Sequence, residues 1–246
     1  MLDAVGSTLA SAGPAEGPSI TQEAKADGPR GARHFMLFKP DCCLSQFVLN
    51  GSVKLRAHQR LLSSLPSCAA LPAGVMAVGR LDEDSEGLLL LTTDGALSYE
   101  VTSGGCEKAY YALLEGTVGP EALVRLRAGV DIHHKGDTYR TLPCEVAPLP
   151  VPPALPPRRK KVRDSRQLRD GTIVAVPTTW VSIVLRQGRN RQIRKMTAEV
   201  GHPTLRLVRV RVGDTLLGDM APGELRPWNP GTRTAMTDNR TPPPAT

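Results

Sequence analysis

Short apolar runs bounded by glycine, proline or charged residues recur through the middle of the chain. Four of them have the length and flanks of buried β-strands: residues 35–39, which stop at Pro40, and residues 75–81, 87–93 and 108–116. The second and third runs flank a tight acidic turn. We therefore expect two strands that form a rigid platform for the loop between them.

Two later segments, residues 180–186 and 205–212, alternate apolar and polar positions. This period of two is the pattern of a strand with one buried face. In the second segment Arg209 and Arg211 alternate with valines. We expect the valines to pack in the core and the arginines to face an anion.

Helical periodicity predicts two helices. Pro120 opens the first, since proline is tolerated in a first turn, and Leu123 and Leu126 fall on one face. The second is expected to be capped by Asn190 and to end at Gly201. Its apolar stripe consists of Ile193, Met196 and Val200.

The predicted folded domain spans residues 35–228, between two segments of biased composition. Residues 1–34 are rich in Ala, Gly, Ser and Pro, and residues 229–246 in Pro, Gly and Thr. We expect a disordered or targeting tail at the first end and a disordered tail at the second. Within the domain, residues 146–170 begin as a proline-rich stretch and continue as a dense basic run, which predicts a surface loop.

The charge of the chain favours a polyanionic partner. Lys and Arg number 31 against 24 Asp and Glu, which gives a net charge of +7. The 5 cysteines are scattered, without the spacing of a disulfide framework or a zinc site, and we interpret them as reduced. No apolar run is long enough to cross a bilayer, so we expect no membrane insertion.

Acidic residues are densest in residues 79–87, Gly-Arg-Leu-Asp-Glu-Asp-Ser-Glu-Gly, between two apolar runs. A solvated turn is one interpretation, because Asp, Ser and Gly are ordinary turn residues. A calcium loop is a second, but Thr93 stands where such a loop needs a bidentate glutamate. A two-metal nuclease is a third, but it would need further acids at the ends of other elements, and none stands out. Metal binding is therefore the minority interpretation, and no metal site is predicted.

Three motifs resemble one family in its own order. Residues 79–95, GRLDEDSEGLLLLTTDG, closely resemble a signature of the RsuA-like ribosomal-RNA pseudouridine synthases. Residues 188–226 resemble a second signature and KAYY at 108–111 a third. The resemblance extends over residues 35–228 and favours RluE-type large-subunit enzymes, which lack the N-terminal helical RNA-binding domain. It implies the pseudouridine synthase fold, an α+β domain with a mixed, mostly antiparallel sheet, flanking helices and a central active-site cleft.

The resemblance also implies three catalytic residues. Asp82 matches the aspartate of the family's R-L-D motif, Tyr110 the tyrosine of K-x-Y, and Arg194 the basic residue of Q-[IV]-[RK]. Arg80 is expected to hold or displace the target nucleotide. One departure is that Phe38 replaces the asparagine of the family's N-K-P motif.

The reaction itself explains these residue types. Converting uridine to its C-glycoside breaks a C–N bond, turns the base and forms a C–C bond, with no redox change and no group donor. No cofactor is therefore expected. The site needs an ionised carboxylate in a pocket that excludes water. Burial alone disfavours a carboxylate anion, whereas a nearby guanidinium stabilises it. We expect Arg194 to be that partner of Asp82, and Tyr110 to stack on uracil or relay a proton.

The expected partner is ribosomal RNA, with the large subunit favoured. A flipped-out base and a basic rim for the RNA backbone are required. We expect a cytoplasmic monomer, or an organellar one if residues 1–34 are a targeting segment. A non-catalytic RNA-binding or ribosome-assembly protein on the same fold is the main alternative, and the joint presence of the three catalytic candidates argues against it. The RNA-binding candidates are Arg80, Arg189, Arg191, Lys195, Arg206, Arg209 and Arg211.

Overall fold

The computed structural model describes residues 31, 33–49, 54–103, 105–163, 165–167 and 169–231. The two predicted tails lie outside these residues, except for their inner ends. Within the described part of the chain, no helix combines the length and apolarity needed to cross a membrane.

Strands dominate the described chain, because its apolar runs are short and bounded by glycines and prolines. The helical elements are the 3-10 helices η1 Leu62–Ser64 and η2 Pro66–Cys68 and the α-helices α1 Gly95–Ser103, α2 Pro120–Ala128 and α3 Gln192–Glu199. The strands are β1 His34–Lys39, β2 Met76–Val78, β3 Glu86–Thr92, β4 Lys108–Glu115, β5 Asp131–His134, β6 Asp137–Arg140, β7 Glu145–Pro148, β8 Ser165–Gln167, β9 Ile173–Ala175, β10 Thr178–Leu185, β11 Thr204–Val212, β12 Thr215–Leu216 and β13 Leu225–Pro227.

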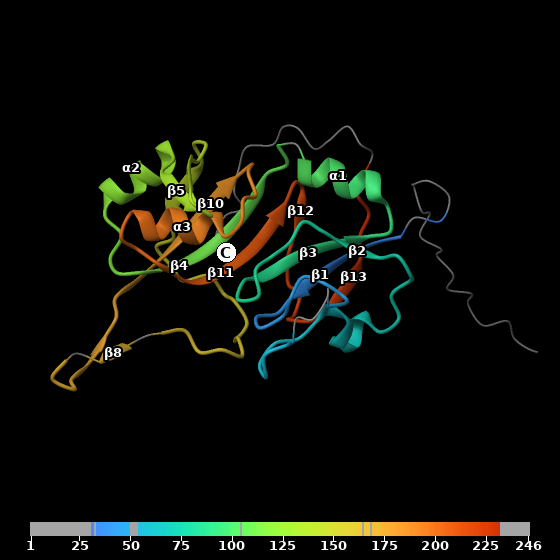
Figure 1. Ribbon diagram of the computed structural model, residues 1–246, viewed down its shortest axis with the longest axis horizontal. Coiled ribbons are helices and arrows are strands. Elements are labelled where there is room, and N and C mark those ends of the chain that lie inside the picture. Colours follow the sequence, from blue (N-terminus) through green and yellow to red (C-terminus); the bar gives the residue numbers. More distant parts are fainter. Residues whose placement is uncertain are drawn as a thin grey trace, which may run out of the picture.

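One mixed sheet runs through the molecule in the order β13-β1-β3-β11-β4-β10-β7, with β2 beside β3 and β12 beside β11. Its strand pairs are antiparallel except for β3 with β11, which run parallel. In Figure 1, α2, α3 and β5 gather at one end of the sheet, whereas α1, η1 and η2 lie toward the other. The predicted α+β architecture with a mostly antiparallel sheet is confirmed.

Neighbouring residues of the central strands enter different cores. Leu207 belongs to a cluster that includes the buried faces of α2 and α3. Val208 belongs to a second cluster with the buried residues of α1, because successive strand side chains point to opposite faces. A third cluster joins Leu89 and Leu91 of β3 to η1 and η2. The sheet is therefore covered on both faces.

The start of α3 differs from the prediction. Its N-cap is Arg191, in the left-handed conformation with φ of 51°, and not Asn190. The turn before the helix is instead held by Gln192, whose side-chain oxygen accepts the N–H of Arg189 at 3.1 Å. The predicted apolar stripe is buried as expected.

The predicted surface loop over residues 146–170 is partly wrong. It begins inside β7, which pairs with β10 and tolerates Pro148 because it is an edge strand. Farther on, Leu155 packs against the second core cluster and the Arg158 side chain is only 7% exposed. Beyond this point β8 and β9 form a hairpin, and β8 projects from the body of the molecule in Figure 1.

Gly87 marks the place where β3 meets β11 in parallel. Its φ is +100°, and an added Cβ would collide with the backbone of Arg209. We predict that Gly87→Ala lowers the free energy of unfolding by more than about 1 kcal/mol, measured by urea denaturation. Gly95→Ala is the matched control, because a Cβ at this position of α1 meets nothing within 4 Å. Equal stability of the two variants would contradict the close approach of the strands.

Candidate active site

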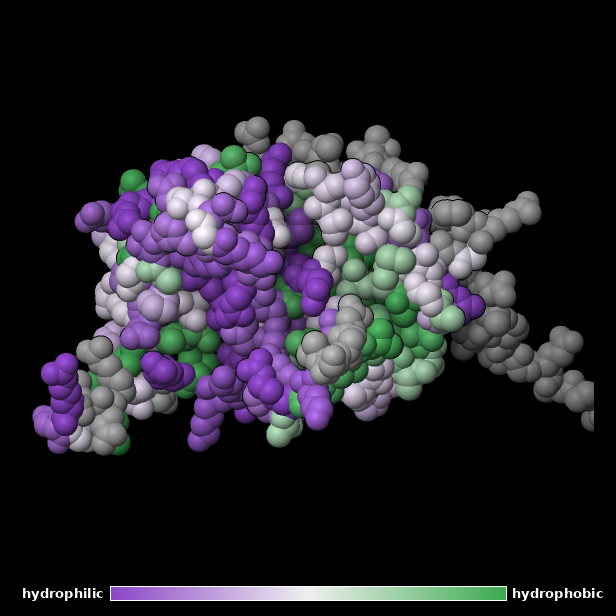
Figure 2. All heavy atoms as spheres, viewed as in Figure 1, coloured by the Kyte–Doolittle hydropathy of each residue, from purple (hydrophilic) through white to green (hydrophobic). Residues whose placement is uncertain are grey.

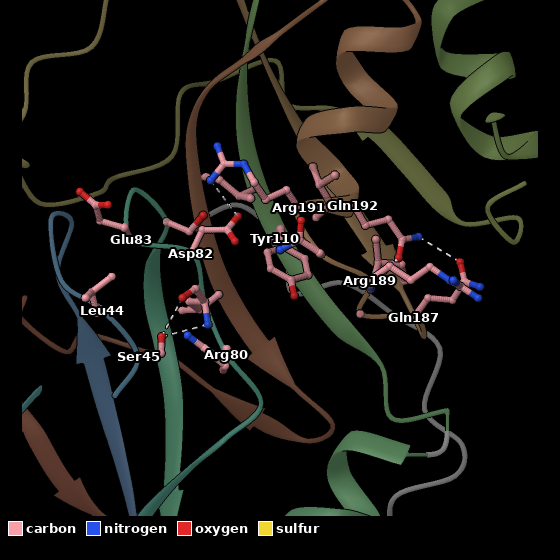
Figure 3. Close-up of a pocket in the computed structure, with 17 residues that line it drawn as sticks. Leu44, Ser45, Arg80, Asp82, Glu83, Tyr110, Gln187, Arg189, Arg191 and Gln192 are labelled. Atoms are coloured by element: carbon pink, nitrogen blue, oxygen red, sulfur yellow. Dashed lines mark hydrogen bonds and ion pairs between the residues drawn. The ribbon is translucent and has the colours of Figure 1, made fainter. Parts of the chain in front are cut away.

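A cavity of about 630 Å³ opens beside the acidic turn, within the usual size range of ligand pockets. Its walls come from segments far apart in the sequence: the turn between β2 and β3, the loop after β1, strands β4 and β11, and the segment that leads into α3 (Figure 3). The cavity thus lies at the centre of the sheet, as the predicted cleft does. Its lining includes Asp82, Tyr110, Arg80, Arg189 and Arg191.

The backbone just before Asp82 is held by a buried serine. The Ser45 hydroxyl donates to the carbonyl oxygen of Leu81 at 2.8 Å and accepts the N–H of Leu81 at 3.0 Å. Both groups of one residue are therefore satisfied by a single side chain from the loop after β1 (Figure 3). This double contact restricts where Asp82 can lie.

A buried lysine holds the backbone after Asp82. Lys39 is 0% exposed and donates from Nζ to the carbonyl oxygens of Ser85 at 2.7 Å, Pro40 at 2.9 Å and Glu83 at 3.3 Å. Burial lowers the pKa of Lys39 to about 8, although nearby acidic groups oppose the shift. The lysine of the Phe-Lys-Pro motif is thus an internal clamp on the turn.

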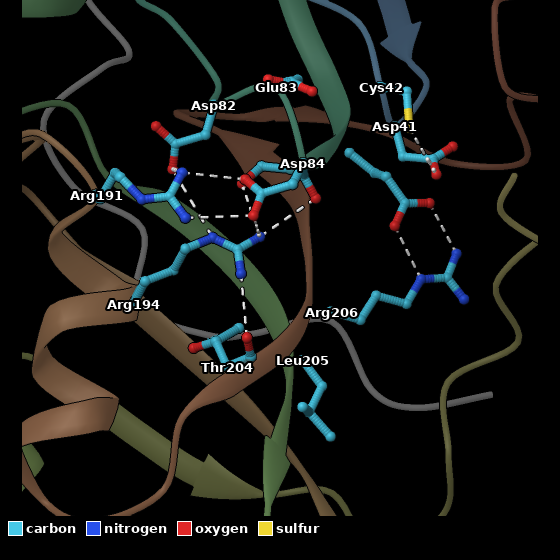
Figure 4. A network of polar contacts seen from close by, with 12 residues as sticks. Asp41, Cys42, Asp82, Glu83, Asp84, Arg191, Arg194, Thr204, Leu205 and Arg206 are labelled. Atoms are coloured by element: carbon cyan, nitrogen blue, oxygen red, sulfur yellow. Dashed lines mark hydrogen bonds and ion pairs between the residues drawn. The ribbon is translucent and has the colours of Figure 1, made fainter. Parts of the chain in front are cut away.

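Two arginines of the α3 segment face the carboxylates of the turn (Figure 4). Arg191 donates to both oxygens of Asp84 at 3.2 Å, and its Nη1 lies 3.6 Å from Oδ2 of Asp82. Arg194 Nη2 lies 3.4 Å from Oδ2 of Asp84. Burial raises the pKa of Asp84, but the hydrogen bonds from Arg191 and the charges of both arginines outweigh it, so the net shift is downward. Asp84 is therefore held as an anion.

Arg194 is fixed from several sides but keeps one donor free of hydrogen bonds. It donates to the carbonyl oxygens of Thr204 at 3.1 Å and Asp84 at 3.2 Å, and to the Ser85 hydroxyl at 3.3 Å. Its Nε is buried, has no hydrogen-bond partner among the described residues, and lies 3.9 Å from Oδ2 of Asp82. The guanidinium nitrogen nearest Asp82 is therefore the one that makes no hydrogen bond.

The remaining rim candidates differ in position. Arg189 stacks on the ring of Tyr139, with its guanidinium carbon 3.4 Å from the ring centroid. Arg80 donates to Gln46 at 3.4 Å. Lys195 is not among the residues that line the cavity, and its Nζ lies 3.1 Å from Nδ1 of His134.

Three RNA-binding candidates were placed wrongly. Arg206, Arg209 and Arg211 are 8%, 3% and 8% exposed, because β11 is a central strand with both faces covered. Arg206 binds Glu86 through two contacts at 2.9 and 3.0 Å. Arg209 donates to the carbonyl oxygen of Leu88, and Arg211 to that of Gly213 and to Glu107. These arginines stabilise the inside of the sheet and do not form an RNA-facing surface.

Several site residues were missed or given too small a role. Asp84 and Glu86 lie in the acidic turn, but the arginine that binds each of them was not predicted. No sequence pattern around Ser45 indicates its role. The Phe-Lys-Pro motif includes Lys39 but does not indicate the contacts that Lys39 makes. Within the described residues, no three His, Cys, Asp or Glu side chains come together as a metal site.

Residues 47–199 match the sequence profile of the RNA pseudouridylate synthases, and the chain belongs to this family. It is 42% identical over 189 residues to ribosomal large subunit pseudouridine synthase E of Xanthomonas axonopodis pv. citri (strain 306), covering 76% of this chain and 89% of the relative. It is 31% identical over 200 residues to ribosomal small subunit pseudouridine synthase A of Escherichia coli (strain K12), covering 80% and 71%. The resemblance to the RsuA-like family, and to its RluE-type members, is confirmed.

Comparison with solved structures supports the fold. The crystal structure of a pseudouridylate synthase aligns with 80% of this chain and 70% of its own, with a TM-score of 0.57 and 24% sequence identity. At this level of identity the similarity establishes the pseudouridine synthase fold alone.

We predict that Ser45→Ala lowers the free energy of unfolding by about 1–3 kcal/mol, because it leaves the buried polar groups of Leu81 without partners. Urea denaturation measures the change. Ser63→Ala is the matched control, since the Ser63 hydroxyl makes one exposed bond to the carbonyl oxygen of Phe47. A smaller loss for Ser45→Ala than for Ser63→Ala would show that the turn does not depend on this serine.

Proposed function

We propose that this protein isomerises a specific uridine of ribosomal RNA, in the large subunit, to pseudouridine, with Asp82 as the catalytic carboxylate. The placement of Asp82 carries the proposal. Its carboxylate borders the cavity that Tyr110 also lines, with guanidinium nitrogens of Arg191 and Arg194 at 3.6 and 3.9 Å. The name of the 42% identical Xanthomonas relative supports the large subunit as the source of the substrate.

The side chains suit an isomerisation that balances without a cofactor. The bond from the ribose carbon C1′ to N1 of uracil breaks, the base turns, C5 bonds to C1′, C5 loses its proton and N1 gains one. Asp82 acts as the nucleophile, or as the base and ion stabiliser. Arg194 and Arg191 place positive charge beside its carboxylate, with nitrogens 3.9 and 3.6 Å from Oδ2. Tyr110 stacks on the uracil or relays the proton through its hydroxyl.

The rim of the cavity fits a flipped nucleotide. Extrusion of a base costs a few kcal/mol, which contacts in the pocket and to the RNA backbone offset. Arg80, Arg189 and Arg191 line the opening and supply positive charge next to the catalytic carboxylate. Lys195 is farther out on α3, where it would meet the RNA backbone on the approach to the cavity.

We further propose that residues 35–228 are the catalytic domain and that it acts as a cytoplasmic monomer. The cytoplasm is supported by the ribosomal RNA named for the relatives.

The main alternative remains a binding protein that uses the same fold without catalysis. It would need a basic surface but no ordered carboxylate. Asp82 and Tyr110 line one cavity and Arg194 pairs with Asp82, and this combination favours the enzyme.

We predict that Asp82→Asn lowers pseudouridine formation on unmodified large-subunit ribosomal RNA more than about 10³-fold, because it removes the reacting charge. Chemical mapping of pseudouridine in metal-free buffer is the measurement. Asp219→Asn makes the same change at an exposed position that pairs with Arg226, and it should retain activity. Binding of the RNA by the native protein with no pseudouridine formed would favour the non-catalytic alternative.

We predict that Lys195→Gln weakens RNA binding and reduces the slope of log affinity against log salt by about 1, because one phosphate contact is lost. Filter binding at several salt concentrations gives both values. Arg33→Gln is the control, because it also removes one positive charge from an exposed residue. Arg33 binds Thr93, which follows β3 at the end of that strand farther from the acidic turn. An unchanged slope for Lys195→Gln would place this residue off the RNA path.

A further inference from the structure

A segment that is distant in sequence from the acidic turn lies near it on the face of the sheet opposite the cavity. This segment, residues 149–163, connects β7 to β8 and is called the strap here. Leu155 of the strap packs against the second core cluster, on the face that Val208 occupies. Leu207 lines the cavity from the other face. The strap therefore crosses the side of the sheet opposite the cavity.

Arg158 of the strap enters a buried cluster of four charges. Its side chain is 7% exposed, and its Nε lies 3.4 Å from Asp41 and 3.6 Å from Glu86. Glu86 also pairs with Arg206, which donates in turn to the carbonyl oxygen of Pro156 in the strap. Two carboxylates thus meet two guanidiniums, and loss of one partner would leave a buried charge uncompensated.

Asp41 fastens the strap through its backbone as well. Its carboxylate accepts the N–H of Arg159 at 3.1 Å and the N–H of Lys160 at 2.8 Å. Burial raises the pKa of Asp41, but these two hydrogen bonds and the charge of Arg158 outweigh it, so the pKa is lowered. The strap is therefore anchored by an anion at the end of β1, next to Lys39.

The same arginine reaches both walls of the cavity from behind. Arg158 Nη2 donates to the carbonyl oxygen of Asp84 at 3.5 Å, the oxygen that Arg194 also binds. Arg158 Nη1 donates to the carbonyl oxygen of Leu205, in the first part of β11. The Arg158 side chain thus connects the acidic turn to the strand that carries Leu207.

We propose that Arg158 is a positioning residue that fixes the acidic turn, and with it Asp82, from the face opposite the substrate. The inference rests on the proposed function, since it assigns Arg158 a part in the same reaction. It also links the exposed cations of the strap to the turn, because they follow Arg158 directly in the chain. These exposed cations are Arg159, Lys160, Lys161 and Arg163.

Arg158→Gln is the central test. At saturating enzyme, the single-turnover rate on an unmodified large-subunit ribosomal RNA transcript should fall at least about 30-fold, because a misplacement of about 1 Å at a reacting group costs up to about 100-fold. The Kd for the same RNA, from filter binding, should change less than about 3-fold, because Arg158 lies behind the cavity and makes no rim contact. Arg158→Lys should recover part of the rate, since it keeps the charge but cannot reach two carboxylates and two carbonyl oxygens together.

A second measurement does not depend on activity. Amide hydrogen exchange in residues 82–86 should accelerate at least about 10-fold in Arg158→Gln, while exchange in α2 stays at the native rate. Arg33→Gln is the matched control for charge and should change neither measurement. If Arg158→Gln does not fold, Arg158→Lys and Asp41→Asn take its place, since Asp41→Asn removes the charge that faces Arg158 and should lower the rate with the Kd retained.

The outcomes separate the two proposals. A rate within about 3-fold of the native protein, with faster exchange absent, would reduce Arg158 to an anchor of the strap and overturn the inference. A large rise in Kd with the native rate would instead make it an RNA contact, which also overturns it. Failure of the native protein to form pseudouridine would refute the proposed function, and the exchange result would still decide whether Arg158 holds the turn.

Discussion

Opposite charges hold the acidic turn in its shape, and the cavity depends on that shape. Arg158, Arg191 and Arg194 arrive from two distant segments, and the Lys39 ammonium binds the backbone of the same turn. Charges removed from water attract strongly only when their geometry and hydrogen bonds are complete. These contacts restrict the backbone of the turn. The position of Asp82 is therefore set mostly by contacts that the neighbouring residues of the turn make.

Successive side chains of β11 point to opposite faces of the sheet, and the two faces have different roles. Leu207 forms part of the cavity wall, while Arg206 on its N-terminal side binds Glu86 on the opposite face. A shift of one residue in the pairing of β11 would exchange these faces and place an arginine in the cavity. The register with β4 and β3 thus specifies the site as much as any single side chain does.

The sequence predicted what depends on local patterns and missed what depends on distant pairs. The main strands and the apolar stripe of α3 followed from periodicity, and family motifs supplied Asp82, Tyr110 and Arg194 as catalytic candidates. The alternating pattern of β11 could not show whether its arginines face an anion outside the protein or the buried Glu86, because a buried ion pair and an exposed arginine give the same pattern. The bond between Ser45 and Leu81, 36 residues apart, and the left-handed backbone of Arg191 leave no trace in composition or spacing.

The position of β11 in the sheet has a consequence for the synthesis of the protein. This strand lies between β3 and β4, yet it is made long after both, and it carries the cavity wall and the partner of Glu86. Before it emerges from the ribosome, β3 and β4 have no shared neighbour, and Glu86 lacks its partner Arg206. The nascent chain therefore stays without a formed site until its last main strand is in place, and ordering of the site coincides with completion of the fold.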